Sequence, residues 1–203
     1  MSGRADKSIF APGEAIARLK DGNSRYTNGN LQHPGQTTER RAELAKSQHP
    51  FAIIVSCCDS RVPPEIVFDQ GIGDLFICRV AGNVINDESL GSIEYAVDHL
   101  GVRLILVLGH QRCGTVQAAK ETIAAKGKAF GHIESLVTAI KPAVEATVNG
   151  DLDATIKANV KHVVDALRSS TPILKPKVDA DELKVVGANY SLDTGFVSFL
   201  DEQ

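Results

Sequence analysis

Short apolar runs alternate with amphipathic segments along most of the chain. Residues 51–56 form a continuous apolar run rich in β-branched side chains, and residues 74–80, 103–108 and 183–188 are mostly apolar segments with the same pattern. Runs of this length are typical of parallel strands that helices cover on both faces. We therefore expect these four segments to form a central sheet.

Helical spacing marks the segments between these runs. Residues 88–100 and 151–168 place their apolar side chains on one helix face, and Asp151 is available as an N-cap. Residues 131–148 and the segment after Cys113 are further helix candidates. Strands that alternate with helices predict an α/β fold, with a mostly parallel central sheet flanked by helices.

The N-terminal part of the chain has a different pattern. Residues 12–29, with Pro12 in a first-turn position, and the highly charged residues 37–48 predict two helices. Neither helix has enough apolar surface to fold alone, so we expect residues 1–48 to form an N-terminal helical arm. No repeat or long linker divides the chain, and residues 1–203 are expected to form one domain.

Composition narrows the class of protein. The chain has 22 Lys and Arg against 25 Asp and Glu, a net charge of −3, which argues against a nucleic-acid-binding surface. No apolar run approaches the roughly 20 residues that span a bilayer, and the N-terminus lacks the apolar region of a signal peptide. We therefore expect no membrane partner and a cytoplasmic location.

The four cysteines are too few for a disulfide framework in a chain of this size, so we expect free thiols. Cys78 lies within an apolar run and is expected in the core. Cys57 and Cys58 directly follow the first predicted strand, and Cys113 follows the third, all beside polar, charged or glycine residues. These three thiols need another explanation.

Soft metal ligands follow two of the predicted strands, at the end of the sheet where α/β proteins bind ligands. His110 and Cys113 are separated by two residues, and Cys57 could complete a Cys2His set. Three protein ligands leave the fourth position of a zinc ion to water or substrate, which is the catalytic pattern. We expect Gly109 and Gly114 to free the backbone for the tight turn that this site needs.

A possible charge pair follows Cys57. In extended chain Asp59 and Arg61 share a face with Cys57, whereas Cys58 faces away and is not expected to be a ligand. The pair could orient a bound water, or the carboxylate of Asp59 could itself ligate the metal. On spacing alone, a structural zinc site, core thiols and a solvated Asp59–Arg61 ion pair stay open as alternatives.

Two motifs carry a family resemblance. Residues 57–63, CCDSRVP, together with HQRCG at residues 110–114, closely resemble the signature of the β-class carbonic anhydrases. Residues 69–85, 91–114 and 187–195 also look like the corresponding family segments. The resemblance implies an active enzyme that hydrates carbon dioxide reversibly to bicarbonate and a proton, with Zn²⁺ as its cofactor.

The resemblance also implies roles for individual residues. Cys57, His110 and Cys113 would hold the zinc, and Asp59 with Arg61 would form the catalytic dyad. Asp59 would orient the nucleophile, and Arg61 would hold Asp59. In some members the aspartate swings in as a fourth ligand, so Asp59 is a candidate zinc ligand as well.

Further family features concern assembly and a second site. Members pack the N-terminal arm on a partner subunit, which implies a homodimer or homotetramer with residues 1–48 as the arm. Some members hold a non-catalytic bicarbonate between a Trp, an Arg and a Tyr. Arg79 and Tyr190 match the last two, but Ile54 stands at the Trp position and the chain has no Trp. The remaining histidines are expected to be surface or helix-face residues and not ligands: His33, His49, His99, His132 and His162.

Two other functions compete with this one. A carbon disulfide or carbonyl sulfide hydrolase would use the same scaffold and the same nucleophile on a different carbon. A zinc-holding or redox-sensing module without catalysis would use Cys57, Cys58 and Cys113 as oxidisable thiols. The presence of Asp59 and Arg61 disfavours that module, because neither holding zinc nor sensing an oxidant requires them.

Overall fold

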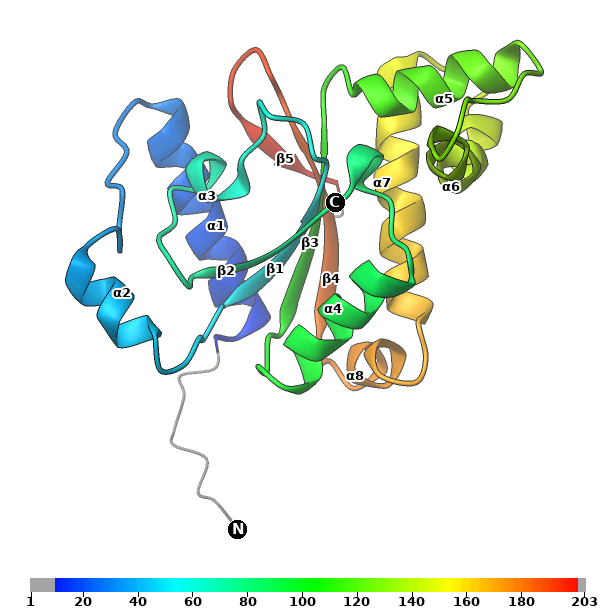
Figure 1. The fold of residues 1–203 in the computed structure, drawn as a ribbon. Helices are drawn as coiled ribbons and strands as arrows, with labels where there is room; N and C mark the ends of the chain where they lie inside the picture. The colour runs from blue at the N-terminus through cyan, green and yellow to red at the C-terminus, as the bar shows by residue number, and fades with distance from the viewer. Residues whose placement is uncertain (1–9, 201–203) are drawn as a thin grey trace.

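A five-stranded sheet lies between two layers of helices in the computed structural model, which describes residues 10–200 (Figure 1). The strands are β1 (Ala52–Ser56), β2 (Leu75–Arg79), β3 (Leu104–His110), β4 (Lys184–Tyr190) and β5 (Val197–Phe199). Their order is β2-β1-β3-β4-β5; the first four are parallel, and β5 runs antiparallel to β4. This arrangement confirms the predicted α/β class, with the short strand β5 as an addition.

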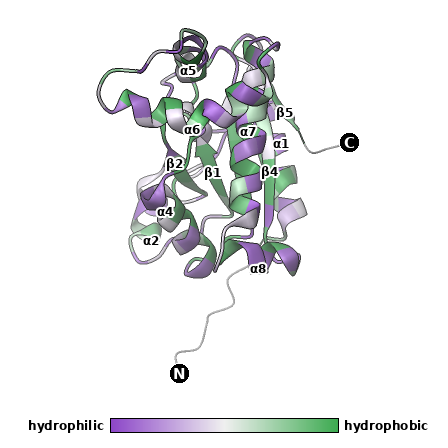
Figure 2. Ribbon diagram, turned by 90° about the vertical axis from the view of Figure 1, so that its right-hand side faces the viewer, coloured by the Kyte–Doolittle hydropathy of each residue, from purple (hydrophilic) through white to green (hydrophobic). Residues whose placement is uncertain are grey.

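Helices cover both faces of the sheet. They are α1 (Pro12–Thr27), α2 (Thr38–Leu44), α3 (Pro64–Val67), α4 (Asp87–Asp98), α5 (Gly114–Ala124), α6 (Ile133–Ala146), α7 (Leu152–Ser169) and α8 (Leu174–Asp179), with a 3-10 turn η1 (Ala81–Asn83). Helix α1 packs on one face, and α4 and α7 pack on the other. Figure 2 shows the hydrophobic strands enclosed by helices whose outward faces are hydrophilic. No described helix is long and apolar enough to cross a membrane.

Strand β3 is longer than its apolar run predicts. Residues 103–108 are the predicted strand, but β3 continues to His110 because Gly109 pairs with Asn189 and His110 pairs with Tyr190 of β4. A glycine followed by a histidine carries no apolar signal, so the sequence pattern hides this extension. It places His110 at the carboxyl end of the sheet.

The first predicted helix of the N-terminal arm is present as α1, and residues 1–9 of the arm lie outside the described residues. Helix α1 buries Ala15 and Leu19 fully against the sheet of its own chain. The second helix ends at Leu44, well before residue 48, and none of its residues is buried. The arm therefore contributes α1 to the core and leaves α2 on the surface. Cys78 is buried in the core beneath α4, as expected.

Candidate metal centre

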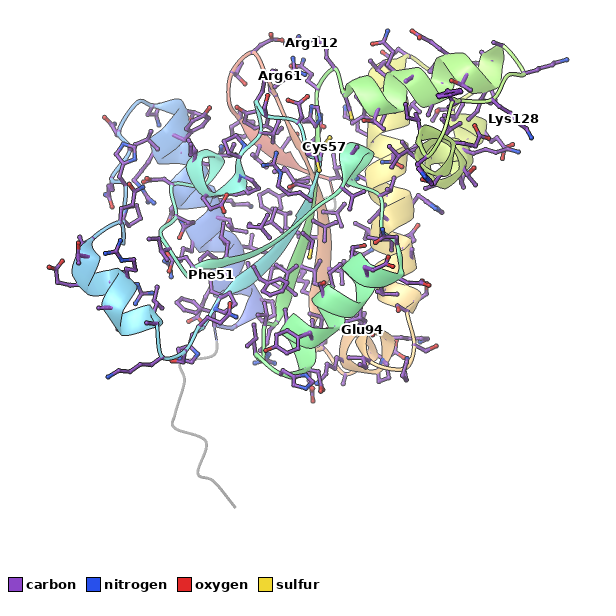
Figure 3. The ribbon with its side chains drawn as sticks, in the orientation of Figure 1. Phe51, Cys57, Arg61, Glu94, Arg112 and Lys128 are labelled. Carbon is purple, nitrogen blue, oxygen red and sulfur yellow. The ribbon has the colours of Figure 1, made fainter. Side chains whose placement is uncertain are left out.

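The site lies where the direction of the chain reverses across the sheet. Strand β1 leads to β2 on one side, whereas the next strand, β3, lies on the other side of β1. The carboxyl ends of β1 and β3 therefore flank a switch point, where open α/β sheets bind ligands. Cys57 follows β1, His110 ends β3, and Cys113 is the N-cap of α5. Figure 3 shows Cys57 at this end of the sheet, with Arg61 and Arg112 beyond it.

Three possible ligand atoms converge there. One atom each of Cys57, His110 and Cys113 lies within 4.8 Å of the others, and all three residues are buried. Cys58, in contrast, is an exposed thiol. The opposite placement of the two neighbouring cysteines agrees with their alternation in extended chain.

The histidine ring is oriented for metal binding. His110 Nδ1 lies 3.0 Å from the carbonyl oxygen of Gln111, which can only accept, so Nδ1 carries the proton. Nε2 then presents a lone pair, and it is buried without a hydrogen-bond partner among the described residues. A buried acceptor without a partner is costly unless something else fills that role. An Nδ1–H bonded to a carbonyl is also the usual arrangement behind a metal-ligating histidine. The donor set therefore fits a soft divalent ion such as zinc.

The two buried thiols affect each other's ionisation. Hydrogen bonds with Cys113 and with the Gly82 amide lower the pKa of Cys57 to about 4 against the opposing effect of burial. The interaction with Cys57 and burial raise the pKa of Cys113, while amides in the first turn of α5 act in the other direction. Without a metal the two thiols titrate as one coupled pair, in which ionisation of one opposes ionisation of the other. A bound cation would have to displace the protons that the pair retains.

Asp59 and Arg61 form the predicted charge pair beside the three ligands. Arg61 donates from Nε to Asp59 Oδ1 at 2.9 Å and from a terminal nitrogen to Oδ2 at 2.7 Å. These bonds hold the pKa of Asp59 well below its usual range, against the opposing effect of burial. Asp59 Oδ2 also lies 3.8 Å from His110 Nε2. Asp59 is thus paired with its arginine at the edge of the ligand group, and its role as a fourth ligand stays a prediction.

The turn that carries the ligands uses different residues than expected. Gly109 lies within β3, and a side chain there would come within 2.5 Å of Val160 Cγ2. Gly114 starts α5 and has open space around it. Neither has a positive φ; the residue that does is Arg112, at 51°. The role assigned to both glycines is therefore wrong, because Gly109 is needed for packing and Arg112 makes the turn.

A second set of contacts fastens this turn to the loop after β4. Arg112 donates two hydrogen bonds to the carboxylate of Asp193, at 2.7 and 3.0 Å. The side-chain oxygen of Gln111 accepts from the backbone N–H of Leu192 at 3.1 Å. The sequence analysis missed these contacts because the partners are about 80 residues apart.

The residues that match a second bicarbonate site make other contacts here. Arg79 donates to the carbonyl oxygens of Cys57 and Asp59, at 2.9 and 2.6 Å. The Tyr190 hydroxyl lies 3.1 Å from that of Tyr26. Arg79 therefore holds the backbone of the ligand segment. The five remaining histidines are all exposed, as expected: His33, His49, His99, His132 and His162.

Comparisons with known proteins agree with this geometry. A family model described as carbonic anhydrase matches residues 52–197. Carbonic anhydrase 2 of Mycobacterium tuberculosis is 41% identical over 187 residues, which are 91% of this chain and 90% of that protein.

Solved structures with the same fold point to one class. The β-carbonic anhydrase CafA of Aspergillus fumigatus is 28% identical, with a TM-score of 0.71 over 93% of this chain and 90% of that chain. One of two tetrameric β-carbonic anhydrases from Sordaria macrospora has a TM-score of 0.73 at 23% identity, over 92% and 96% of the two chains, a likeness of fold alone. Since the family model spans most of the chain and the relatives cover nearly all of it, this chain belongs to the β-class carbonic anhydrase family.

Proposed function

We propose that the protein binds Zn²⁺ through Cys57, His110 and Cys113 and catalyses the reversible hydration of carbon dioxide to bicarbonate and a proton. The observation that supports this most directly is the buried convergence of two thiols and one imidazole whose Nε2 lacks a protein partner. The family membership supports the reaction.

The residues around this centre have separate tasks. Bound zinc would supply Lewis acidity, which lowers the pKa of water and makes a nucleophile available near neutral pH. Asp59 keeps a negative charge and can accept a hydrogen bond from the attacking water, which orients that water towards carbon dioxide. Arg61 fixes the carboxylate through two side-chain bonds. The carbonyl of Gln111 fixes the imidazole of His110 in the ligating tautomer.

We also propose that the protein is a homodimer or homotetramer, with the N-terminal arm in the interface. Helix α2 is unburied in the single chain. Ile72, which is 48% exposed, lies in a segment where Gly71 approaches Pro34 and Gly73 approaches Leu44 of the arm. The relatives from Sordaria macrospora are described as tetrameric.

Metal analysis with stopped-flow carbon dioxide hydration tests the first proposal. We expect one zinc per chain in the wild type and a loss of most of it in Cys57→Ser and Cys113→Ser, because each substitution removes one of three ligands. Cys58→Ser is the matched control, since this thiol is exposed. It should keep both zinc and activity.

Two results would contradict the proposal. Zinc lost from Cys58→Ser and kept in Cys57→Ser would reverse the assignment of the neighbouring cysteines. A zinc-loaded protein that turns over carbonyl sulfide or carbon disulfide but not carbon dioxide would keep the metal centre and replace the substrate.

A further inference from the structure

A fully buried asparagine in the middle of α7 is used by none of the functions above. Asn159 is 0% exposed. Its side-chain Nδ2 donates a 2.8 Å hydrogen bond to the backbone carbonyl of Gly82, and its Oδ1 has no partner among the described residues. A carbonyl can only accept, so the orientation of the amide is fixed by this one contact. The side chain therefore acts on Gly82.

Gly82 in turn touches a proposed metal ligand. Its backbone N–H donates to Cys57 Sγ at 3.2 Å. Gly82 has a φ of 71°, which L side chains rarely adopt, and a Cβ there would lie 2.9 Å from Ile140 Cδ1 and 3.2 Å from Thr115 Cγ2. The turn η1 is therefore pressed against α5 and α6 on one side and held by Asn159 on the other.

We infer that Asn159 is a positioning residue for the metal centre: by holding the carbonyl of Gly82, it directs the Gly82 N–H at the sulfur of Cys57. The inference rests on the proposed zinc site. It links α7, which supplies no ligand, to the first ligand of the set through the backbone of one residue, Gly82, whose carbonyl and N–H lie on either side of its Cα.

The expected effect follows from the chemistry of thiolate ligands. A hydrogen bond to a ligating sulfur withdraws electron density from it and fixes its direction, and such bonds tune metal sites. Without Asn159, the carbonyl of Gly82 loses this side-chain donor, and the φ and ψ angles of Gly82 are less constrained. The Gly82 N–H would then shift away from Cys57, so the direction of the sulfur would be less well fixed and the sulfur would become more electron-rich.

Cobalt substitution gives a readout that general destabilisation does not move. In the wild type loaded with Co²⁺ we expect a sulfur-to-cobalt charge-transfer band. In Asn159→Leu, which keeps the approximate size of the side chain but cannot donate, the band should shift to longer wavelength. Zinc release to a chelator should become about tenfold faster or more. Asn159→Gln, which retains a donor, should shift the band less than Asn159→Leu.

Two further variants separate positioning from folding. Gly82→Ala displaces the backbone of the same residue, because a Cβ there would press on Ile140 and Thr115, and it should shift the band in the same direction even if Asn159→Leu does not fold. Val163→Ala, on the same helix and equally buried in the core beneath the sheet, should lower the melting temperature and leave the band in place.

The outcomes are distinct. A wild-type protein without a thiolate band overturns the metal centre and the inference with it. A normal wild-type band that neither Asn159→Leu nor Gly82→Ala moves overturns the inference alone. The same is true if Val163→Ala shifts the band as much as Asn159→Leu does.

Discussion

Two aspartate–arginine pairs lie at the carboxyl end of the sheet, and they differ in their exposure and in their distance from the proposed metal ligands. The Asp59 side chain is 16% exposed and approaches His110. The Asp193 side chain is 59% exposed and holds Arg112 on the rim. Both carboxylates accept two side-chain hydrogen bonds from one guanidinium. Position relative to the proposed ligands, rather than pairing itself, is therefore what favours Asp59 over Asp193 for the proposed catalytic role.

This contrast gives a matched test. We expect Asp59→Asn to lower kcat/KM for hydration on the order of 100-fold, because the amide cannot replace the charged acceptor. Asp193→Asn should change kcat/KM by less than about twofold, since exposed ion pairs contribute little. Stopped-flow assays of both variants give the comparison. An Asp59→Asn enzyme as active as the wild type would remove Asp59 from the mechanism.

The pH profile of the same enzymes tests the charge of the ligand set. Two thiolates and a neutral imidazole cancel the charge of a divalent ion, so water at the site should be acidified less than at a three-histidine site. We therefore expect kcat/KM to rise from neutral towards alkaline pH. Since the pKa of Asp59 lies well below its usual range, Asp59 does not titrate in this region. A flat wild-type profile would contradict this charge argument.

At the level of single residues, the sequence identifies the atoms that could bind a metal and misses those that orient them. Cys57, His110 and Cys113 have distinctive chemistry and follow predicted strands. Asn159 and Gly82 have neither feature, because a polar residue on an amphipathic helix and a glycine after a strand are common. The signal that could have identified Asn159 is its position within the apolar stripe of α7, where an asparagine is unusual.

Element ends decide where the ligands lie. Gly109, the second-last residue of β3, passes beneath Val160 of α7, which leaves no room for a side chain. We expect Gly109→Ala to destabilise the protein by about 1–3 kcal/mol and to lower its zinc content, because His110 is the next residue. Gly114→Ala, with open space around it, should change stability by less than about 0.5 kcal/mol. Thermal unfolding and metal analysis of both variants measure these effects. Equal stability and equal zinc content in Gly109→Ala and Gly114→Ala would contradict the packing role of Gly109.

The end of α1 depends on one buried carboxylate. The Asp69 side chain is 1% exposed, accepts from Arg25 Nε at 2.6 Å, and accepts from the backbone N–H groups of Gln32 and His33. Burial alone would raise the pKa of Asp69, but these donors outweigh it and the pKa lies below its usual value. Asp69 therefore fastens the arm to the body as an anion.

This arrangement predicts a pH-dependent contribution to stability. We expect Asp69→Asn to lower the free energy of unfolding by about 3 kcal/mol at neutral pH. Because the folded-state pKa is below the unfolded value of about 4, the difference should be constant at higher pH and shrink as pH falls below that value. Urea unfolding at several pH values measures it, with exposed Asp21→Asn as the control. A difference that persists unchanged in acid would contradict the role of the charge.

Short elements escape prediction for a physical reason. Periodicity needs several residues to show itself, and β5 has three residues and α3 four. Strand β5 exists because β4 offers it a free edge, with Ala188 paired to Phe199. Such an element depends on its neighbour more than on its own sequence.

At the scale of the whole molecule, the order of the strands creates the site. Periodicity predicts which segments are strands, but it does not say that β1 and β3 are neighbours. Only that adjacency, with Val55 opposite Val107, brings Cys57 next to His110. The family resemblance supplied this link, whereas the spacing of residues alone left a structural zinc site and simple core thiols open.

Large apolar side chains are exposed on two separate parts of the surface. Ile66 and Ile72 are 52% and 48% exposed near the arm, and α2 has no buried residue. Phe130 is 95% exposed and belongs to the segment between α5 and α6, which Figure 1 shows on the opposite side of the sheet from α2. If the surface around the N-terminal arm forms the proposed interface, the partner subunit covers Ile66 and Ile72. Phe130 would then lie outside the interface.

Light scattering of charge variants separates these surfaces. The double variant Ile66→Asp with Ile72→Asp should give folded monomers of one chain mass at micromolar concentration, because two buried unpaired charges at an interface cost several kcal/mol. Phe130→Asp should keep the mass of the wild type. The double variant tests the interface without disturbing the core. A deletion of residues 1–36 would instead remove the buried Ala15 and Leu19. A wild-type protein that is monomeric and fully active would refute the proposed assembly, and dissociation by Phe130→Asp alone would move the interface to the other end of the molecule.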